Sequence, residues 1–174
     1  MTQSVELTLD EGADTAVRAQ WARLADAGLP TEQRTKPSPS HRPHVTLFAA
    51  DALAAGADAR LPVLFNGLDL ELRLGGVLLF GPRRGSYVLT RQVVVSTPLL
   101  ALQTAVAAVC GADPDGQFGP GHWTPHVTLA RRVPQDQVTD VLAALGGVPD
   151  LVATSRGCRR WDSERRETWE LVPR

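Results

Sequence analysis

Alternation of apolar and polar residues predicts where this chain forms strands. Over residues 4–9, every second side chain is apolar, which is the two-residue period of a half-buried strand. The same kind of pattern predicts further strands in the segments 68–80, 87–95 and 151–172. The first of these segments contains a predicted hairpin turn at Gly75-Gly76, and the last contains a polar turn near 162–165.

A different spacing, with apolar residues three and four positions apart, predicts helices. The predicted helices are residues 14–27, a segment from a Thr97 cap to Gly111, a segment that opens at Pro134, and one or two turns within 51–59. Loops rich in proline, glycine and serine, at 31–42 and 113–124, follow the first two helices.

The pentapeptide PHVTL occurs at residues 43–47 and again at 125–129. Both halves of the chain run strand, helix, loop, PHVTL, helix and paired strands, so an internal duplication explains the pattern better than coincidence. We therefore expect one domain, 1–174, made of two pseudo-symmetric lobes at approximately 1–82 and 83–174, related by a twofold axis.

Composition limits the classes of function. The formal charge of −1 provides no overall field toward nucleic acid or anionic lipid, so any site for a polyanion must be local. No segment has the length and apolarity of a membrane span or the pattern of a secretory signal, and the two cysteines are too few for a disulfide framework. We expect a cytoplasmic monomer that binds no membrane.

In an extended PHVTL segment, His and Thr point to one face and Val and Leu to the other. His44 with Thr46, and His126 with Thr128, can then face each other across a groove between the lobes. Such imidazoles suit displacement at phosphorus as acid and base, because histidine has an unperturbed pKa of roughly 6.5. A single histidine of this kind is more often structural, so the repetition carries the inference.

The paired His-x-Thr-Leu sequences resemble the two-histidine (2H) phosphoesterase superfamily, in its branch of 2′-5′ RNA ligases or RNA 2′,3′-cyclic phosphodiesterases. The resemblance implies an α+β bilobal fold with antiparallel sheets that line a central cleft and helices outside. It also implies metal-independent hydrolysis of an RNA or nucleotide 2′,3′-cyclic phosphate to a 2′-phosphate, with reversible 2′-5′ ligation, and no cofactor.

The resemblance carries catalytic roles onto His44, Thr46, His126 and Thr128, with His126 as general base and His44 as general acid. The duplicated motif itself is compatible with either polarity. The second motif, HVTLAR, also matches through Arg131, which the family uses to contact the phosphate. In a regular pleat, however, Arg131 lies on the strand face opposite His126.

Three aromatic residues, Phe48, Phe118 and Trp123, are candidates for stacking on a base, although packing explains each of them as well. A local basic rim for RNA competes with scattered surface charge as the explanation for Arg83, Arg84, Arg91, Arg132, Arg156, Arg159 and Arg160. Two alternatives to the enzyme stay open. One is a nucleotide- or RNA-binding protein without catalysis. The other is a zinc protein that uses the spacings His41-x-x-His44 and His122-x-x-x-His126.

Overall fold

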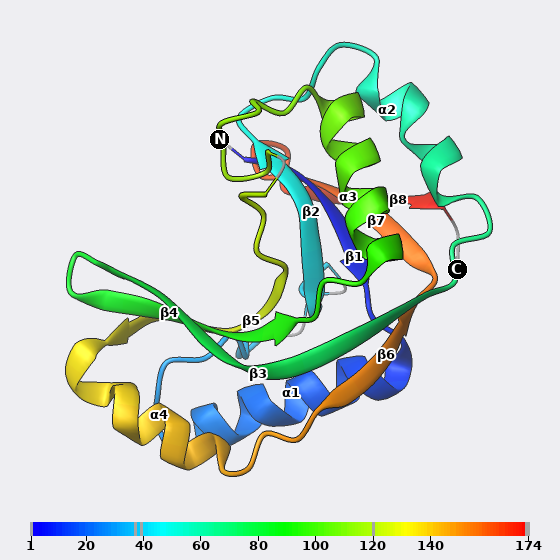
Figure 1. Ribbon diagram of the computed structural model, residues 1–174. Helices are drawn as coiled ribbons and strands as arrows, with labels where there is room; N and C mark the ends of the chain where they lie inside the picture. Colours follow the sequence, from blue (N-terminus) through cyan, green and yellow to red (C-terminus); the bar gives the residue numbers. More distant parts are fainter. Residues whose placement is uncertain (1, 37, 39, 120, 173–174) are drawn as a thin grey trace.

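The computed structural model describes residues 2–36, 38, 40–119 and 121–172, and these form two antiparallel four-stranded sheets with helices around them (Figure 1). Three prolines of the predicted loops, Pro37, Pro39 and Pro120, lie outside the described residues. The first sheet has the order β2-β1-β7-β8 and consists of β1 (Gln3–Thr8), β2 (His44–Ala50), β7 (Gly157–Asp162) and β8 (Glu167–Val172). The second has the order β5-β4-β3-β6 and consists of β3 (Leu70–Arg83), β4 (Ser86–Val93), β5 (His126–Pro134) and β6 (Leu151–Ser155).

The predicted α+β class with two antiparallel sheets is confirmed, but the sheets do not follow the two halves of the sequence. The first sheet joins the first two strands of the chain to the last two, while β3 of the first half pairs with β4 of the second. A boundary near residue 82 therefore does not divide the structure, because it falls inside β3 and separates strands that pair with each other.

Helices α1 (Glu11–Asp26) and α3 (Thr97–Cys110) are exchanged between the sheets, because each links two strands of one sheet but packs against the other sheet. Helix α1 links β1 to β2 of the first sheet but packs against β5 and β6 of the second, together with α4 (Val138–Leu145). Helix α3 links β4 to β5 of the second sheet and packs on β2 of the first. Figure 1 shows α1 and α4 along the second sheet, and α3 beside β2 with α2 (Ala57–Arg60).

Helix ends follow the expected capping chemistry with small shifts in position. Asp10 caps α1 by accepting a hydrogen bond from the Ala13 amide at 2.9 Å. Ser96, rather than the predicted Thr97, caps α3, and Gly111 ends that helix in the left-handed conformation. The third predicted helix starts later than Pro134, because β5 continues to that residue and the 3₁₀ turn η2 (Gln135–Gln137) intervenes before α4.

The predicted hairpin at Gly75-Gly76 is wrong, because β3 runs through both glycines as one strand. The pairing with β4 shifts by one residue between Leu74 and Val77, so the glycines form a bulge. The buried side chain of Arg91 donates hydrogen bonds to the carbonyls of Gly75 and Leu74, both at 2.7 Å, and thereby binds the bulged backbone.

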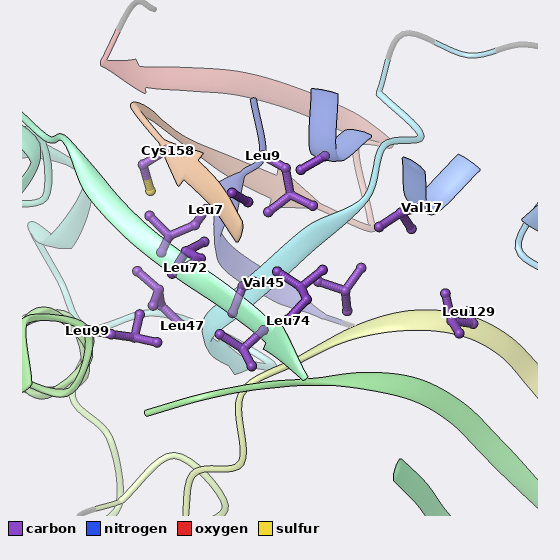
Figure 2. Close-up of a cluster of buried hydrophobic side chains, with 14 of the residues drawn as sticks. Leu7, Leu9, Val17, Val45, Leu47, Leu72, Leu74, Leu99, Leu129 and Cys158 are labelled. Atoms are coloured by element: carbon purple, nitrogen blue, oxygen red, sulfur yellow. The ribbon is translucent and has the colours of Figure 1, made fainter. Parts of the chain in front are cut away.

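One hydrophobic core joins the two sheets. Figure 2 shows Val45 and Leu47 of β2 beside Leu72 and Leu74 of β3, with Leu99 of α3 next to them. Another 3₁₀ turn, η1 (Pro62–Phe65), adds the fully buried Phe65 to this core. None of the helices in the described ranges is long and apolar enough to cross a bilayer.

Candidate active site

The two motif strands contain the same irregularity at the same position. The pairing of β1 with β2 passes from Glu6–Thr46 to Val5–Phe48, which leaves Leu47 without a cross-strand partner. The pairing of β4 with β5 passes from Thr90–Thr128 to Leu89–Ala130, which leaves out Leu129. Each strand therefore has a β-bulge directly after its His-x-Thr, where two consecutive apolar side chains are buried.

The bulge in β5 corrects the expected orientation of Arg131. Leu129 and Ala130 both enter the core, so the alternation of faces slips by one residue. Arg131 consequently lies on the same face as Thr128, and both line one crevice. A regular pleat would have placed them on opposite faces.

Both histidines have the same hydrogen bond at Nδ1. His44 Nδ1 lies 2.7 Å from the Arg42 carbonyl oxygen, and His126 Nδ1 lies 2.8 Å from that of Thr124. A carbonyl can only accept, so Nδ1 donates in both rings and a neutral ring leaves Nε2 as the acceptor. The proline of each motif, Pro43 or Pro125, biases the preceding residue toward extended backbone, and it is that residue whose carbonyl accepts the bond.

His44 lies beside a buried carboxylate. Its Nε2 is 3.6 Å from Oε1 of Glu6, and the same oxygen accepts the Ser4 hydroxyl at 2.7 Å. The other oxygen of Glu6 accepts Nε and Nη2 of buried Arg159 at 2.9 and 2.8 Å. Burial disfavours the charged form of Glu6, but the charges of His44 and Arg159 and the hydrogen bonds from Ser4 and Arg159 outweigh it and lower the pKa of this carboxyl.

His126 has the opposite surroundings. The ring of Phe80 packs on its imidazole with centroids 4.8 Å apart. The position in β4 that corresponds to Glu6 is opposite Thr128, and it is occupied by Thr90 rather than by a carboxylate. Burial lowers the pKa of His126, and the charges of His44 and Arg131 lower it further against the effect of the Thr124 hydrogen bond. His126 is therefore held toward its neutral form, while His44 lies next to a negative charge.

Two tryptophans bind the backbone of the motifs in matching ways. Trp21 of α1 donates its indole N–H to the Thr128 carbonyl, and Trp123 donates to the Thr46 carbonyl, both at 3.0 Å. The exchanged helix α1 and the loop before β5 thus each hold the motif strand of the opposite sheet. These bonds place both threonines relative to the lobe across from them.

A narrow crevice brings together residues from both sheets. It is bounded by His44 of the first sheet and by Thr128 and Arg131 of the second, with other walls from Trp21, Glu32, His41, Arg42 and Pro43. Arg131 is 60% exposed and donates Nε to Oε1 of Glu32 at 3.1 Å. Glu32 also donates its amide to the carbonyl of the bulged Leu129 at 2.9 Å, which attaches the loop after α1 to β5.

The predicted aromatic candidates do not form an open stacking surface. Phe48 is 3% exposed and lies in the core, where Phe118 packs on it at 5.5 Å between ring centroids. Phe48 is therefore a packing residue, because the bulge turns it inward beside Leu47. Trp123 is half-buried with its N–H bound to Thr46, and the proposed basic rim is interrupted because Arg91, Arg159 and Arg160 are buried.

The histidine spacings that suggested zinc do not build a ligand cluster. Among the residues that the structure describes, no group of three or more His, Cys, Asp or Glu side chains lies close enough to hold a metal ion. His41 has Nε2 within 2.6 Å of the Glu32 carbonyl, which fixes that nitrogen as a donor. His122 is exposed in the loop before β5.

Glu6 and Phe80 are site residues that the sequence did not predict. Glu6 occupies a polar position of an alternating strand, where an acidic residue is ordinarily solvated, and only the pairing of β1 with β2 places it near His44. Phe80 lies in a strand of the first half, and its contact with His126 of the second half depends on the long β3.

A family model described as the 2′-5′ RNA ligase superfamily matches residues 13–166. The chain belongs to this superfamily. The protein TT0787 of Thermus thermophilus has a similar fold, with TM-score 0.59, 20% identity and coverage of 99% of this chain and 96% of that one. E. coli LigT in complex with 3′-AMP is also similar, with TM-score 0.55, 15% identity and 98% coverage of both chains.

Usb1 of Kluyveromyces marxianus has the same overall fold at TM-score 0.54 and 12% identity, with 99% of this chain and 98% of that one covered. No curated protein sequence matches this chain. The superfamily assignment supports a role in processing phosphodiesters and confirms the resemblance to 2H phosphoesterases.

Proposed function

We propose that this protein is an RNA 2′,3′-cyclic phosphodiesterase that opens the cyclic phosphate to a 2′-phosphate. The observation that carries the proposal is the crevice between the sheets, where His44 faces Thr128 and Arg131 of the opposite motif strand. The charge of His44 also acts on His126, so both imidazoles belong to one electrostatic site. Each presents Nε2 as the nitrogen left for substrate.

In the proposed reaction, Nε2 of neutral His126 takes a proton from water as the water oxygen bonds to phosphorus. The bond from phosphorus to the 3′ oxygen breaks, and His44 gives that oxygen the proton from its Nε2. One water is consumed, and the products are a 2′-phosphate and a free 3′-hydroxyl. Glu6 supports this polarity because its carboxylate lies 3.6 Å from Nε2 of His44 as a counter-charge for a proton donor, whereas the apolar ring of Phe80 packs on His126.

The residues beside the histidines suit the charge that develops on the phosphoryl group. The hydroxyls of Thr46 and Thr128 can donate to its non-bridging oxygens, and Arg131 can add a cation. Arg131 uses Nε for Glu32, and its 60% exposure leaves the guanidinium open to the crevice. If the 5′ hydroxyl of a second strand replaces water, the same groups would open the cyclic phosphate to a 2′-5′ linkage, and the bond from phosphorus to the 3′ oxygen would break as in hydrolysis.

The known structures support a nucleotide ligand of this kind. LigT is described in complexes with 3′-AMP, ATP and phosphate, and its fold matches nearly all of this chain. The cytoplasmic location and monomeric state expected from the sequence stay predictions.

The test is hydrolysis of adenosine 2′,3′-cyclic phosphate with identification of the product isomer. We expect adenosine 2′-phosphate, turnover that EDTA does not change, and a rate reduced at least about 100-fold in His44→Ala and in His126→Ala. His122→Ala is the matched control, because this exposed histidine lies outside the motif strands. Full activity in either motif variant would refute the proposal, and binding of cyclic nucleotides without hydrolysis would favour a non-catalytic binding protein.

A further inference from the structure

A second cavity, of about 210 Å³, adjoins the crevice. Trp21 and His41 line both spaces, and they stack on each other with ring centroids 5.2 Å apart. The rest of the cavity wall comes from Arg18 of α1 and from Gln33, Arg34 and Ser38 of the loop after it. The cavity and the crevice of the proposed catalytic residues therefore share one aromatic wall, formed by Trp21 and His41.

The wall of the cavity is held in place by contacts within the protein. The guanidinium of Arg18 lies 5.5 Å from the centre of the Trp21 ring and donates Nη2 to the His41 carbonyl at 3.0 Å. Asp14 binds the Nε of Arg18 from within the same helix. Trp21 is itself fixed by its bond to Thr128, so a ligand in this cavity is placed relative to the motif strand.

The charge of this region is positive, although the whole chain has a formal charge of −1. The residues that line the cavity and the crevice include four arginines and one carboxylate: Arg18, Arg34, Arg42, Arg131 and Glu32. Burial and the charge of Arg34 lower the pKa of His41, and its Nε2 proton is bound by the Glu32 carbonyl. The neutral ring then offers Nδ1 as an acceptor next to two guanidinium groups.

This combination suits a nucleotide more than other small ligands. Guanidinium groups bind phosphate oxygens and stack on bases, and single-stranded RNA is commonly held by such groups together with aromatic walls. At about 210 Å³ the cavity is smaller than the roughly 300–1,000 Å³ of sites for whole drug-sized molecules. It therefore fits one base or one phosphate group beyond the reacting end.

We propose that the cavity lined by Arg18, Arg34 and the stacked Trp21 and His41 binds the nucleotide that precedes the cyclic-phosphate end of an RNA strand. The inference rests on the proposed function and assigns oligoribonucleotides, rather than mononucleotides, as its substrate class. A terminal 2′,3′-cyclic phosphate has no nucleotide on its 3′ side, so the adjacent nucleotide of the strand lies on its 5′ side.

The experiment compares kcat/KM for adenosine 2′,3′-cyclic phosphate with kcat/KM for the dinucleotide ApA that ends in the same group. We expect the wild-type protein to favour the dinucleotide about tenfold and Arg34→Gln to lower this ratio about fivefold. Salt should reduce the ratio less in Arg34→Gln than in the wild-type protein, because one phosphate contact is lost. Arg156→Gln is the matched control, because Arg156 is exposed, pairs with Asp69 and lines neither space.

Calorimetric binding of the two products, adenosine 2′-phosphate and ApA 2′-phosphate, tests the same site without turnover. A wild-type ratio near one, or the same ratio in Arg34→Gln and the wild-type protein, would overturn the assignment of this cavity. If neither cyclic phosphate is hydrolysed but the dinucleotide product binds more tightly and Arg34→Gln removes that preference, the cavity is supported and the catalytic proposal fails.

Discussion

The replacement Glu6→Gln tests how this site distinguishes its two histidines. It removes the charge that lies 3.6 Å from Nε2 of His44 and keeps a side chain of nearly the same shape. The amide oxygen of glutamine can still accept a hydrogen bond from Arg159, so the buried guanidinium keeps a partner. If His44 is the acid, the proton donor loses its counter-charge and kcat falls.

The separation gives the size of the effect. Two unit charges at 3.6 Å interact by about 4–5 kcal/mol at an effective dielectric constant of about 20. The His44 side chain is 27% exposed, and Arg159 neutralises part of the carboxylate charge, so a smaller part of this energy reaches the imidazole. We expect the barrier to rise by about 1.4 kcal/mol, which is about a tenfold fall in kcat.

The assay is the pH dependence of kcat with adenosine 2′,3′-cyclic phosphate, measured beside a thermal melt that reports folding. In Glu6→Gln, kcat should fall about tenfold, while the acid limb of the profile, which reports His126, should stay in place. Ser4→Ala is the matched control, because it removes the hydroxyl bound to the same Oε1 but leaves the charge. A folded Glu6→Gln protein with the kcat of the wild-type protein would refute the role given to Glu6.

Three further predictions concern the pH profile, stability and thiol reactivity. Since the pKa of His126 is lowered from 6.5, the base stays neutral on the acid side of that value, and kcat/KM should fall only below pH 6.5; a fall that begins above it would contradict His126 as the base. Asp10→Ala removes the cap of α1 and its bond to the Thr154 amide, and urea unfolding should show a loss of about 2 kcal/mol. Burial raises the pKa of Cys110 to about 11 and that of Cys158 well above its usual value, so a thiol reagent should modify both only after denaturation.

The parts of the fold that depend on local chemistry could be predicted from the sequence. The helical stripe of α1 and the glycine end of α3 come from side chains a few residues apart, and the structure has both helices close to the expected positions. The hairpin at Gly75-Gly76 was wrong because two adjacent glycines suit a bulge as well as a turn. The bulge is bound by Arg91, which lies on another strand and donates to the Gly75 carbonyl.

The parts of the site that the sequence did not predict also depend on contacts with another strand. The motifs themselves could be found because each is a run of five residues on one strand. Regular alternation placed Arg131 on the face opposite His126, but one bulge per motif strand reverses the alternation beyond the threonine and also turns Phe48 into the core. A bulge leaves no sign in a single strand, because it is defined by the partner strand. Glu6 escaped prediction for the same reason, since its nearest functional neighbour is 38 positions away in sequence but adjacent across the pair of strands.

Duplication alone would give a site with two equivalent histidines, in which neither is fixed as the acid or the base. The two motif strands have the same bulge, the same Nδ1 bond to a carbonyl before proline, and the same indole bond to the threonine carbonyl. Two equivalent imidazoles could exchange roles, and water could then attack with either ring oxygen as the leaving group. The difference lies in the residues that pair with the motif threonines: β1 provides Glu6 opposite Thr46, and β4 provides Thr90 opposite Thr128. On the proposed mechanism, the repeated motif therefore supplies the proton-transfer groups, and this single unrepeated carboxylate determines that the 3′ oxygen leaves.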